Sequence, residues 1–478
     1  MFIVLLGEMA HCQQGDSLTI YLEIAAKNNP SILQKYAEYQ AALQKIPQVG
    51  GLPDPELTTG IFLSPMELVG GNQLADIRLM QMFPWFGVLK AAKDEMSLMA
   101  KAKFESFREA KLQLYFEVQQ SWYELYKTHR ALEISTKNLE ILHTLERLSL
   151  VRFKSAAVSG GSYSSGGGSS ASSVSKGNSG MQTMGGASKP AIQTSPQMQG
   201  GAAPMQGSTT SMQGQSSGSG LADLYRIQME ANELETNIAG IKNQHTTQVA
   251  RFNSLLNRPA LSPVVTPDTL KSEAPGISPA SVSDSLFTNN PMLWMLDYES
   301  KAIDARKQMV TKMGYPMVGL GLNYSLINKN PMSTSAMNGK DMVMPMVTVT
   351  LPFYRKKYRA MQTEVDFLKT ANQQGIQAAK NALQSEYYEA VRNFDDALRR
   401  IELYNKQSKL ANQSLNILMV SFSASGAGLS DLLQVRRQTL DYDLKQTDAL
   451  ADFNTSVARL KKLANIQVTE NSRNTYKK

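Results

Sequence analysis

The chain has 478 residues, 42% of them hydrophobic, and a net charge of +8 at neutral pH. Its hydrophobic residues recur in periodic helical stretches rather than in compact blocks, which indicates an elongated molecule. Lysine and arginine alternate with acidic residues along these stretches, so the charge indicates a solvated surface and argues against a nucleic-acid partner. No run of 18 apolar residues occurs, which excludes a transmembrane helix but leaves open a membrane barrel of short alternating strands.

Residues 1–12 resemble the apolar core and cleavage region of a secretory signal peptide without its basic beginning. Cys12 is the only cysteine and lies at the expected cleavage point. Cleavage after it would leave a mature chain without cysteine. The alternative is that Cys12 becomes a lipidated first residue. Neither case provides a disulfide framework.

The rest of the chain is a tandem duplication, because short segments recur in the same order in both halves. The matching pairs are 28–30 with 289–291, 83–86 with 351–354, 123–124 with 388–389, 220–224 with 428–432, and 250–251 with 458–459. We therefore expect a first repeat at 13–260, a linker at 261–279, a second repeat at 280–466 and a flexible tail at 467–478.

Each repeat is predicted to begin with a helix, at about 17–46 and 280–312, and to continue into a strand pair where the hydrophobic period changes from 3.6 to 2. The predicted strands are 56–65 and 73–83 in the first repeat, and 316–327 and 341–352 in the second. Pro345 cannot donate to a ladder, so we expect a bulge there. Four strands are too few to close a barrel, whereas three copies of the chain supply twelve.

A long coiled-coil hairpin follows each strand pair, at about 88–256 and 356–465. The first helix of each hairpin, at 88–155 and 356–422, would span about 100 Å at 1.5 Å per residue. Residues 423–428 form a short tip in the second hairpin, while the first is interrupted by residues 155–220. That insertion is rich in Gly, Ser, Gln and Met and lacks acidic residues, so we expect it to be disordered. The predicted fold is mostly α with a small β part.

This order of elements, twice over, resembles the TolC-type outer-membrane efflux factor family across essentially the whole mature chain. The resemblance implies a homotrimer with a twelve-stranded transmembrane barrel in the outer membrane and a helical tunnel across the periplasm. It also implies a periplasmic adaptor protein and an inner-membrane pump as partners. In that family, acidic residues near the tips form rings at the channel entrance, and the matching positions are Asp223 and Asp431. The alternative is that each aspartate caps its return helix.

Methionines are the other candidate functional residues. Thioether sulfur is soft and uncharged, so clustered methionine favours Cu(I) and Ag(I), and the family includes a copper- and silver-exporting branch. The insertion could capture such ions or could be a spacer. Met342, Met344 and Met346 alternate on one strand face, which could pass soft ions or pack against lipid and neighbouring strands. The methionines of the insertion are Met181, Met184, Met198, Met205 and Met212.

No constellation for catalysis is present. The four histidines are isolated in the sequence, and no phosphate loop occurs. We therefore expect no enzyme activity and no cofactor. The sequence predicts the passive outer-membrane channel of a tripartite efflux pump, with heavy-metal ions as the expected cargo. The alternatives are a channel for drugs or secreted protein and, from another class, a periplasmic coiled-coil adaptor.

Overall fold

The structure is a computed structural model that describes residues 17–68, 70–159, 219–267, 269–272, 282–283, 285–424 and 428–465. The predictions for the signal peptide at 1–12, for positions 160–218 of the insertion and for the tail at 467–478 lie outside these residues. The chain divides into two compact units, one made of residues 1–138 and 235–478 and the other of residues 139–234. Within the described ranges, none of the helices has the length and apolar character needed to cross a membrane.

The first predicted helix is two helices, α1 (Ser17–Asn28) and α2 (Pro30–Gly50). The break falls at Asn29, whose backbone is extended and whose side chain accepts a hydrogen bond from the Ser31 N–H at 2.9 Å. Pro30 then begins α2, where the N–H that proline lacks would have no intrahelical partner. The expectation of one continuous helix at 17–46 was therefore wrong, because an Asn-Pro pair restarts the helix.

Four strands form one antiparallel sheet in the order β1-β2-β3-β4. They are β1 (Glu56–Leu68), β2 (Gly71–Phe83), β3 (Met317–Asn328) and β4 (Met342–Thr350). β2 of the first repeat pairs with β3 of the second from Phe83↔Val318 to Asn72↔Asn328. The duplicated strand pairs thus join into a single sheet, and the prediction of a mostly helical fold with a small β part is confirmed.

β1 and β4 are the edge strands of this sheet, and each contains a proline. Pro65 lies in the irregular stretch of β1 between Ile61 and Met66, where the register shifts. Pro345 faces Leu322 in an unshifted register, so the bulge expected at Pro345 was wrong. An edge strand has one side without a partner, and proline is tolerated there without a bulge.

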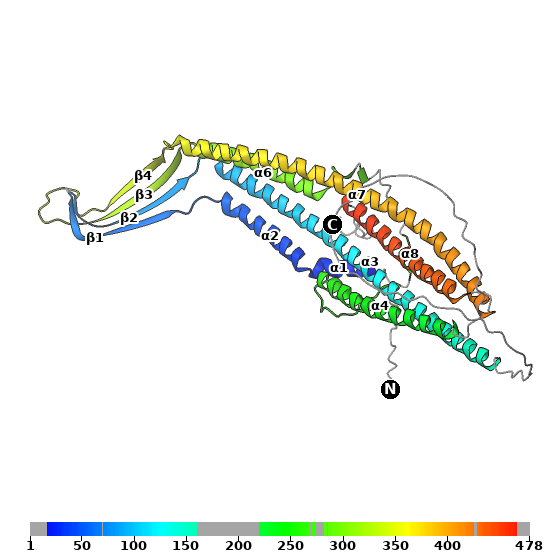
Figure 1. Cartoon of the computed structure of the whole chain (residues 1–478). Coiled ribbons are helices and arrows are strands. Elements are labelled where there is room, and N and C mark those ends of the chain that lie inside the picture. Colours follow the sequence, from blue (N-terminus) through cyan, green and yellow to red (C-terminus); the bar gives the residue numbers. More distant parts are fainter. Residues whose placement is uncertain are drawn as a thin grey trace, which may run out of the picture. The chain divides into compact units, whose positions relative to one another are not determined.

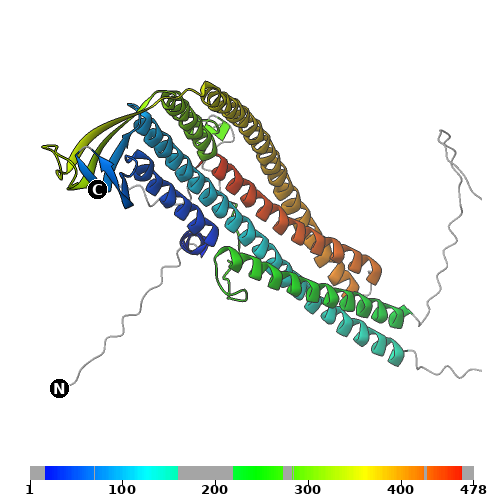
Figure 2. The ribbon, with the colours of Figure 1, turned by 90° about the vertical axis from the view of Figure 1, so that its left-hand side faces the viewer.

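The remaining long elements are helices, and Figures 1 and 2 show α6 beside α7 and α7 beside α8. α3 has 72 residues and α7 has 69 residues. At 1.5 Å per residue, each spans about 100 Å. A helix of this length needs a partner along much of its course, which the return helices supply. The bounds are α3 (Val88–Ser159), α4 (Ser219–Leu255), α6 (Pro291–Met313), α7 (Arg355–Ser423) and α8 (Leu429–Leu463).

The duplication is visible in how the return helices end. Asn257 follows α4 and Asn465 follows α8, and both adopt a left-handed backbone with φ of 53°. Asparagine tolerates this conformation at a helix C-terminus better than most residues. In both repeats an asparagine side chain also donates a hydrogen bond that ties the first helix of the repeat to the end of its return helix. The two bonds are Asn29 Nδ2 to the Leu255 carbonyl at 2.8 Å and Asn465 Nδ2 to the Asn289 carbonyl at 3.0 Å.

Polar contacts join α3 of the first repeat to α8 of the second. Lys127 Nζ lies 3.6 Å from a carboxylate oxygen of Asp448 and 3.7 Å from one of Asp452. Burial by itself lowers the pKa of Lys127, but Asp448, Glu124 and Asp452 outweigh it, so this pKa lies above its ordinary value. The lysine therefore stays charged and links the two repeats.

Candidate functional site

The strand register sorts the side chains of the sheet onto two faces, because successive residues of a strand point to opposite sides. One face, called here the polar face, carries Asp76, Arg78, Asn323 and Ser325, with Gly321 between two methionines and Gly319 beside one. The rows across this face are Gly60–Asp76–Ser325–Met342, Thr58–Arg78–Asn323–Met344, Glu56–Met80–Gly321–Met346 and Met82–Gly319–Thr348.

The opposite face, called here the apolar face, consists almost wholly of aliphatic and aromatic side chains. Leu79, Leu322 and Val347 belong to it by register, and they are 49%, 50% and 70% exposed. A contiguous apolar surface of this extent is unusual on a protein that meets only water and marks a contact with lipid or protein. Alternation of apolar and polar residues with a period of two is the pattern of membrane strands.

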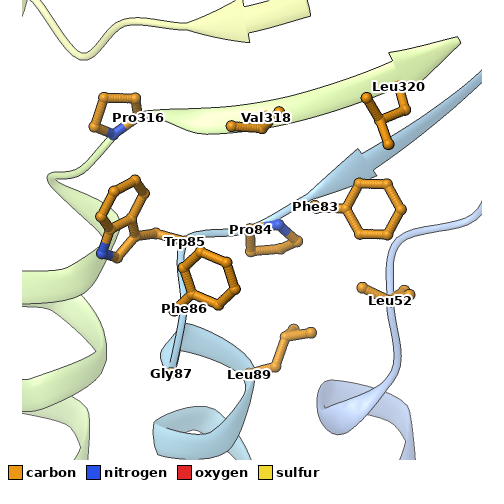
Figure 3. A pocket seen from close by; sticks show the side chains of 10 residues that line it. All are labelled: Leu52, Phe83, Pro84, Trp85, Phe86, Gly87, Leu89, Pro316, Val318 and Leu320. Carbon is orange, nitrogen blue, oxygen red and sulfur yellow. The ribbon is translucent and has the colours of Figure 1, made fainter. Parts of the chain in front are cut away.

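Aromatic side chains gather where the strands meet the helices. Trp85 stacks on Tyr315 with ring centroids 5.3 Å apart. Phe86 and Tyr354, which occupy matching positions in the two repeats, are 87% and 84% exposed. Trp85 and Phe86 border an apolar cavity of about 490 Å³ at the junction of β2 and α3, as Figure 3 shows. Amphipathic aromatic rings concentrate at membrane–water boundaries, so this junction is suited to such a boundary.

Asp431 lies at the tip of the second hairpin and is exposed. It is the third residue of α8, in the first turn, whose N-cap is Gly428 without a side-chain cap hydrogen bond. Asp431 is therefore not the N-cap residue itself, and its charge suits the positive N-terminal end of the helix dipole.

Asp223 is half-buried and is the fifth residue of α4, past the capping position. It belongs to the unit of residues 139–234, whereas Asp431 belongs to the other unit. The predicted acidic ring therefore remains a prediction for both residues. The five candidate metal ligands of the insertion, Met181, Met184, Met198, Met205 and Met212, lie outside the described residues.

Two histidines that are far apart in the sequence meet across the first hairpin. His129 of α3 and His245 of α4 have ring centroids 6.0 Å apart. Burial and the neighbouring His129 lower the pKa of His245. The sequence analysis treated these residues as isolated, because only the antiparallel pairing of the two helices brings them together. Among the residues that the structure covers, no group of three or more His, Cys, Asp or Glu could hold a metal ion.

Neither a protein-family model nor a curated protein sequence matches the chain. Solved structures do match along nearly its whole length. A membrane protein from Pseudomonas aeruginosa matches with a TM-score of 0.68 and 13% identity, covering 94% of this chain and 93% of that one. The outer-membrane channel OprN matches with a TM-score of 0.67 and 13% identity, covering 95% and 91%. The chain has the fold of outer-membrane channels.

A third matched structure is the CmeC outer-membrane channel of Campylobacter jejuni. It matches with a TM-score of 0.66 and 12% identity, covering 94% of this chain and 85% of that one. The matched structures span both repeats, so the strand pairs and the helical hairpins belong to one shared architecture.

Proposed function

We propose that this chain is the outer-membrane channel component of a tripartite efflux pump. The observation that carries the proposal is a sheet with one exposed aliphatic face and one polar face, in a chain with the outer-membrane channel fold. The apolar face contacts lipid and the polar face lines a water-filled path. The aromatic junction that includes Trp85 and Phe86 then lies at the periplasmic boundary of the membrane.

The open edges of the sheet support assembly as a homotrimer. Among the described residues, β1 and β4 each have one side unpaired, and an unpaired strand edge is a template for another strand. When β4 of one copy pairs with β1 of the next, three copies close a barrel of twelve strands. Closure satisfies the backbone groups that could not otherwise be hydrogen-bonded in lipid.

The hairpin tips are the proposed contact with a periplasmic adaptor and, through it, an inner-membrane pump. Asp223 and Asp431 are the proposed entrance residues, because a carboxylate repeated three times around an axis favours cations. The channel itself is passive, and the pump supplies the energy. The proposed cargo is a heavy-metal ion such as Cu(I) or Ag(I), on the basis of the five methionines in the insertion. Drugs and secreted proteins are the alternative cargoes.

Reconstitution of the purified protein into planar lipid bilayers tests this function. We expect a particle that contains three chains and has a cation-selective conductance. Asp431→Asn should reduce the cation selectivity without preventing assembly. A monomer that is soluble without detergent and does not change bilayer conductance would contradict the proposal.

A further inference from the structure

Five methionines lie on the polar face, on the two strands that flank β3. This arrangement follows from the register and was not decided by the alternation of Met342, Met344 and Met346 in the sequence. The row Met80–Gly321–Met346 places one methionine on either side of a glycine. The five are Met80 and Met82 of β2, and Met342, Met344 and Met346 of β4.

The glycines of β3 leave the space above the backbone to these side chains. A β-carbon at Gly319 would lie 2.5 Å from the Sδ atom of Met82, and one at Gly321 would lie 3.7 Å from the Cε atom of Met346. Same-face positions two residues apart on a strand are separated by about 7 Å. Thioether groups from β2 and β4 therefore extend over one short stretch of β3.

Contact with lipid does not account for these methionines. The aliphatic surface of the sheet is the opposite face, while the neighbours of the methionines are polar, as in the row that joins Arg78, Asn323 and Met344. Met342 and Met344 are 50% and 46% exposed, and Met80, Met82 and Met346 are half-buried. Accessible thioethers on a polar surface are free to meet a solute.

We propose that Met80, Met82, Met344 and Met346 form a binding site for a soft monovalent metal ion, Cu(I) or Ag(I), on the polar face. Thioether sulfur is a soft, neutral ligand and selects these ions over Zn²⁺ and Mg²⁺. Unbranched methionine side chains have three rotatable bonds. Met80 and Met346, which flank Gly321, can therefore reach one ion, with Met82 or Met344 as the third ligand. The inference rests on the proposed function, since the channel turns this face toward the exported ion.

The test measures Ag(I) binding to the full-length, detergent-purified protein by equilibrium dialysis in chloride-free buffer. The variant replaces Met80, Met82, Met344 and Met346 with leucine, which conserves volume. We expect the variant to bind at least one Ag(I) fewer per chain than the wild type. The matched control carries four Met→Leu changes on α6 and should bind as the wild type does. Its positions are Met292, Met295, Met309 and Met313.

Gly319→Ala is a second variant, which leaves every methionine in place. Its β-carbon would lie 2.5 Å from the sulfur of Met82 and must displace that side chain. We expect Ag(I) affinity at the site to fall roughly tenfold, as when a group that positions a metal ligand is lost. Equal Ag(I) binding by the wild type, the four-leucine variant and Gly319→Ala would overturn the proposal.

Bilayer conductance of the same preparations separates the two claims. If the wild type conducts as a trimer but Ag(I) binding does not depend on the four methionines, the metal site is refuted and the channel stands. If the wild type neither trimerises nor conducts, the proposed function fails. A loss of Ag(I) binding in the leucine variant would in that case still support the site.

Discussion

The two hairpins place different side chains at one shared position. Counted from the matched segments 123–124 with 388–389 and 250–251 with 458–459, His129 corresponds to Phe394 and His245 to Phe453. The phenylalanine rings are 5.0 Å apart and buried, whereas the histidine rings are 6.0 Å apart and half-buried. Duplication has thus kept a ring-to-ring contact across both hairpins but made it titratable in only one.

The largest expected effect is the loss of stability on removing a ring from the Phe394–Phe453 pair. Phe453→Ala removes a buried ring and should lower the free energy of unfolding by about 3–5 kcal/mol. His245→Ala at the corresponding, more exposed position should cost less than about 1 kcal/mol. Urea denaturation of the detergent-solubilised protein measures both. Similar losses for the two variants would show that the two positions are not different environments.

The tips of the hairpins also differ, and shortening the longer one should stabilise it. Five residues, 424–428, separate α7 from α8, whereas about sixty residues separate α3 from α4. Loop-closure entropy grows with the logarithm of length, so a five-residue turn in place of 160–218 should stabilise the tip by about 2 kcal/mol. Hydrogen exchange of residues 139–159 and 219–234 should then slow. Unchanged exchange would mean that closure entropy does not limit this tip.

The N-caps of α2 and α6 are expected to differ less in their contribution to stability. Asn29→Ala should cost about 2 kcal/mol, because it removes both the cap to Ser31 and the bond to the Leu255 carbonyl. Asn290→Ala removes the cap to the Met292 N–H and should cost about 1 kcal/mol. Asn29→Ser keeps a capping oxygen and serves as the control. Thermal melting measures the stability of all three variants. A larger loss of stability for Asn290→Ala than for Asn29→Ala would contradict the expected order.

The smallest effect is the pH dependence of the first hairpin. The folded pKa of His245 is lowered by burial and by His129, so the unfolded chain binds this proton first as the pH falls. Stability is therefore complete above the ordinary histidine pKa of about 6.5 and decreases below it, down through the lowered folded pKa. His129→Phe/His245→Phe should remove this decrease in melting experiments between pH 7.5 and 5. A decrease of the same size in the double variant would assign it to other groups.

The fold could be predicted from the sequence more completely than the candidate site could. Hydrophobic alternation and helical periodicity are patterns among neighbouring residues, and they were sufficient to predict the strands and the long helices. The break at Asn29 was missed because a proline that starts a helix was read as the interior of one. The unshifted register at Pro345 depended on which strands form the edges, and that is a property of the assembled sheet.

Contacts between residues that are far apart in the sequence could not be predicted from it. His129 and His245 lie more than a hundred positions apart in the sequence, and only the hairpin brings them together. Alternation showed that Met342, Met344 and Met346 share a face, but the register with β2 was needed to show that Arg78 and Asp76 share it too. The roles of Asp223 and Asp431 remain predictions.

The prolines of the edge strands affect how readily unassembled copies of the chain pair with one another. In the proposed assembly, a copy that has not yet joined a trimer presents the edges of β1 and β4, which have no partner among the described residues, to every other copy around it. Pro65 and Pro345 each remove one backbone donor from an edge strand, and proline on an edge strand disfavours unplanned pairing with other chains. Indefinite growth of a sheet from copy to copy is thereby penalised. The two prolines therefore make these edges less suited to aggregation before the proposed trimer forms.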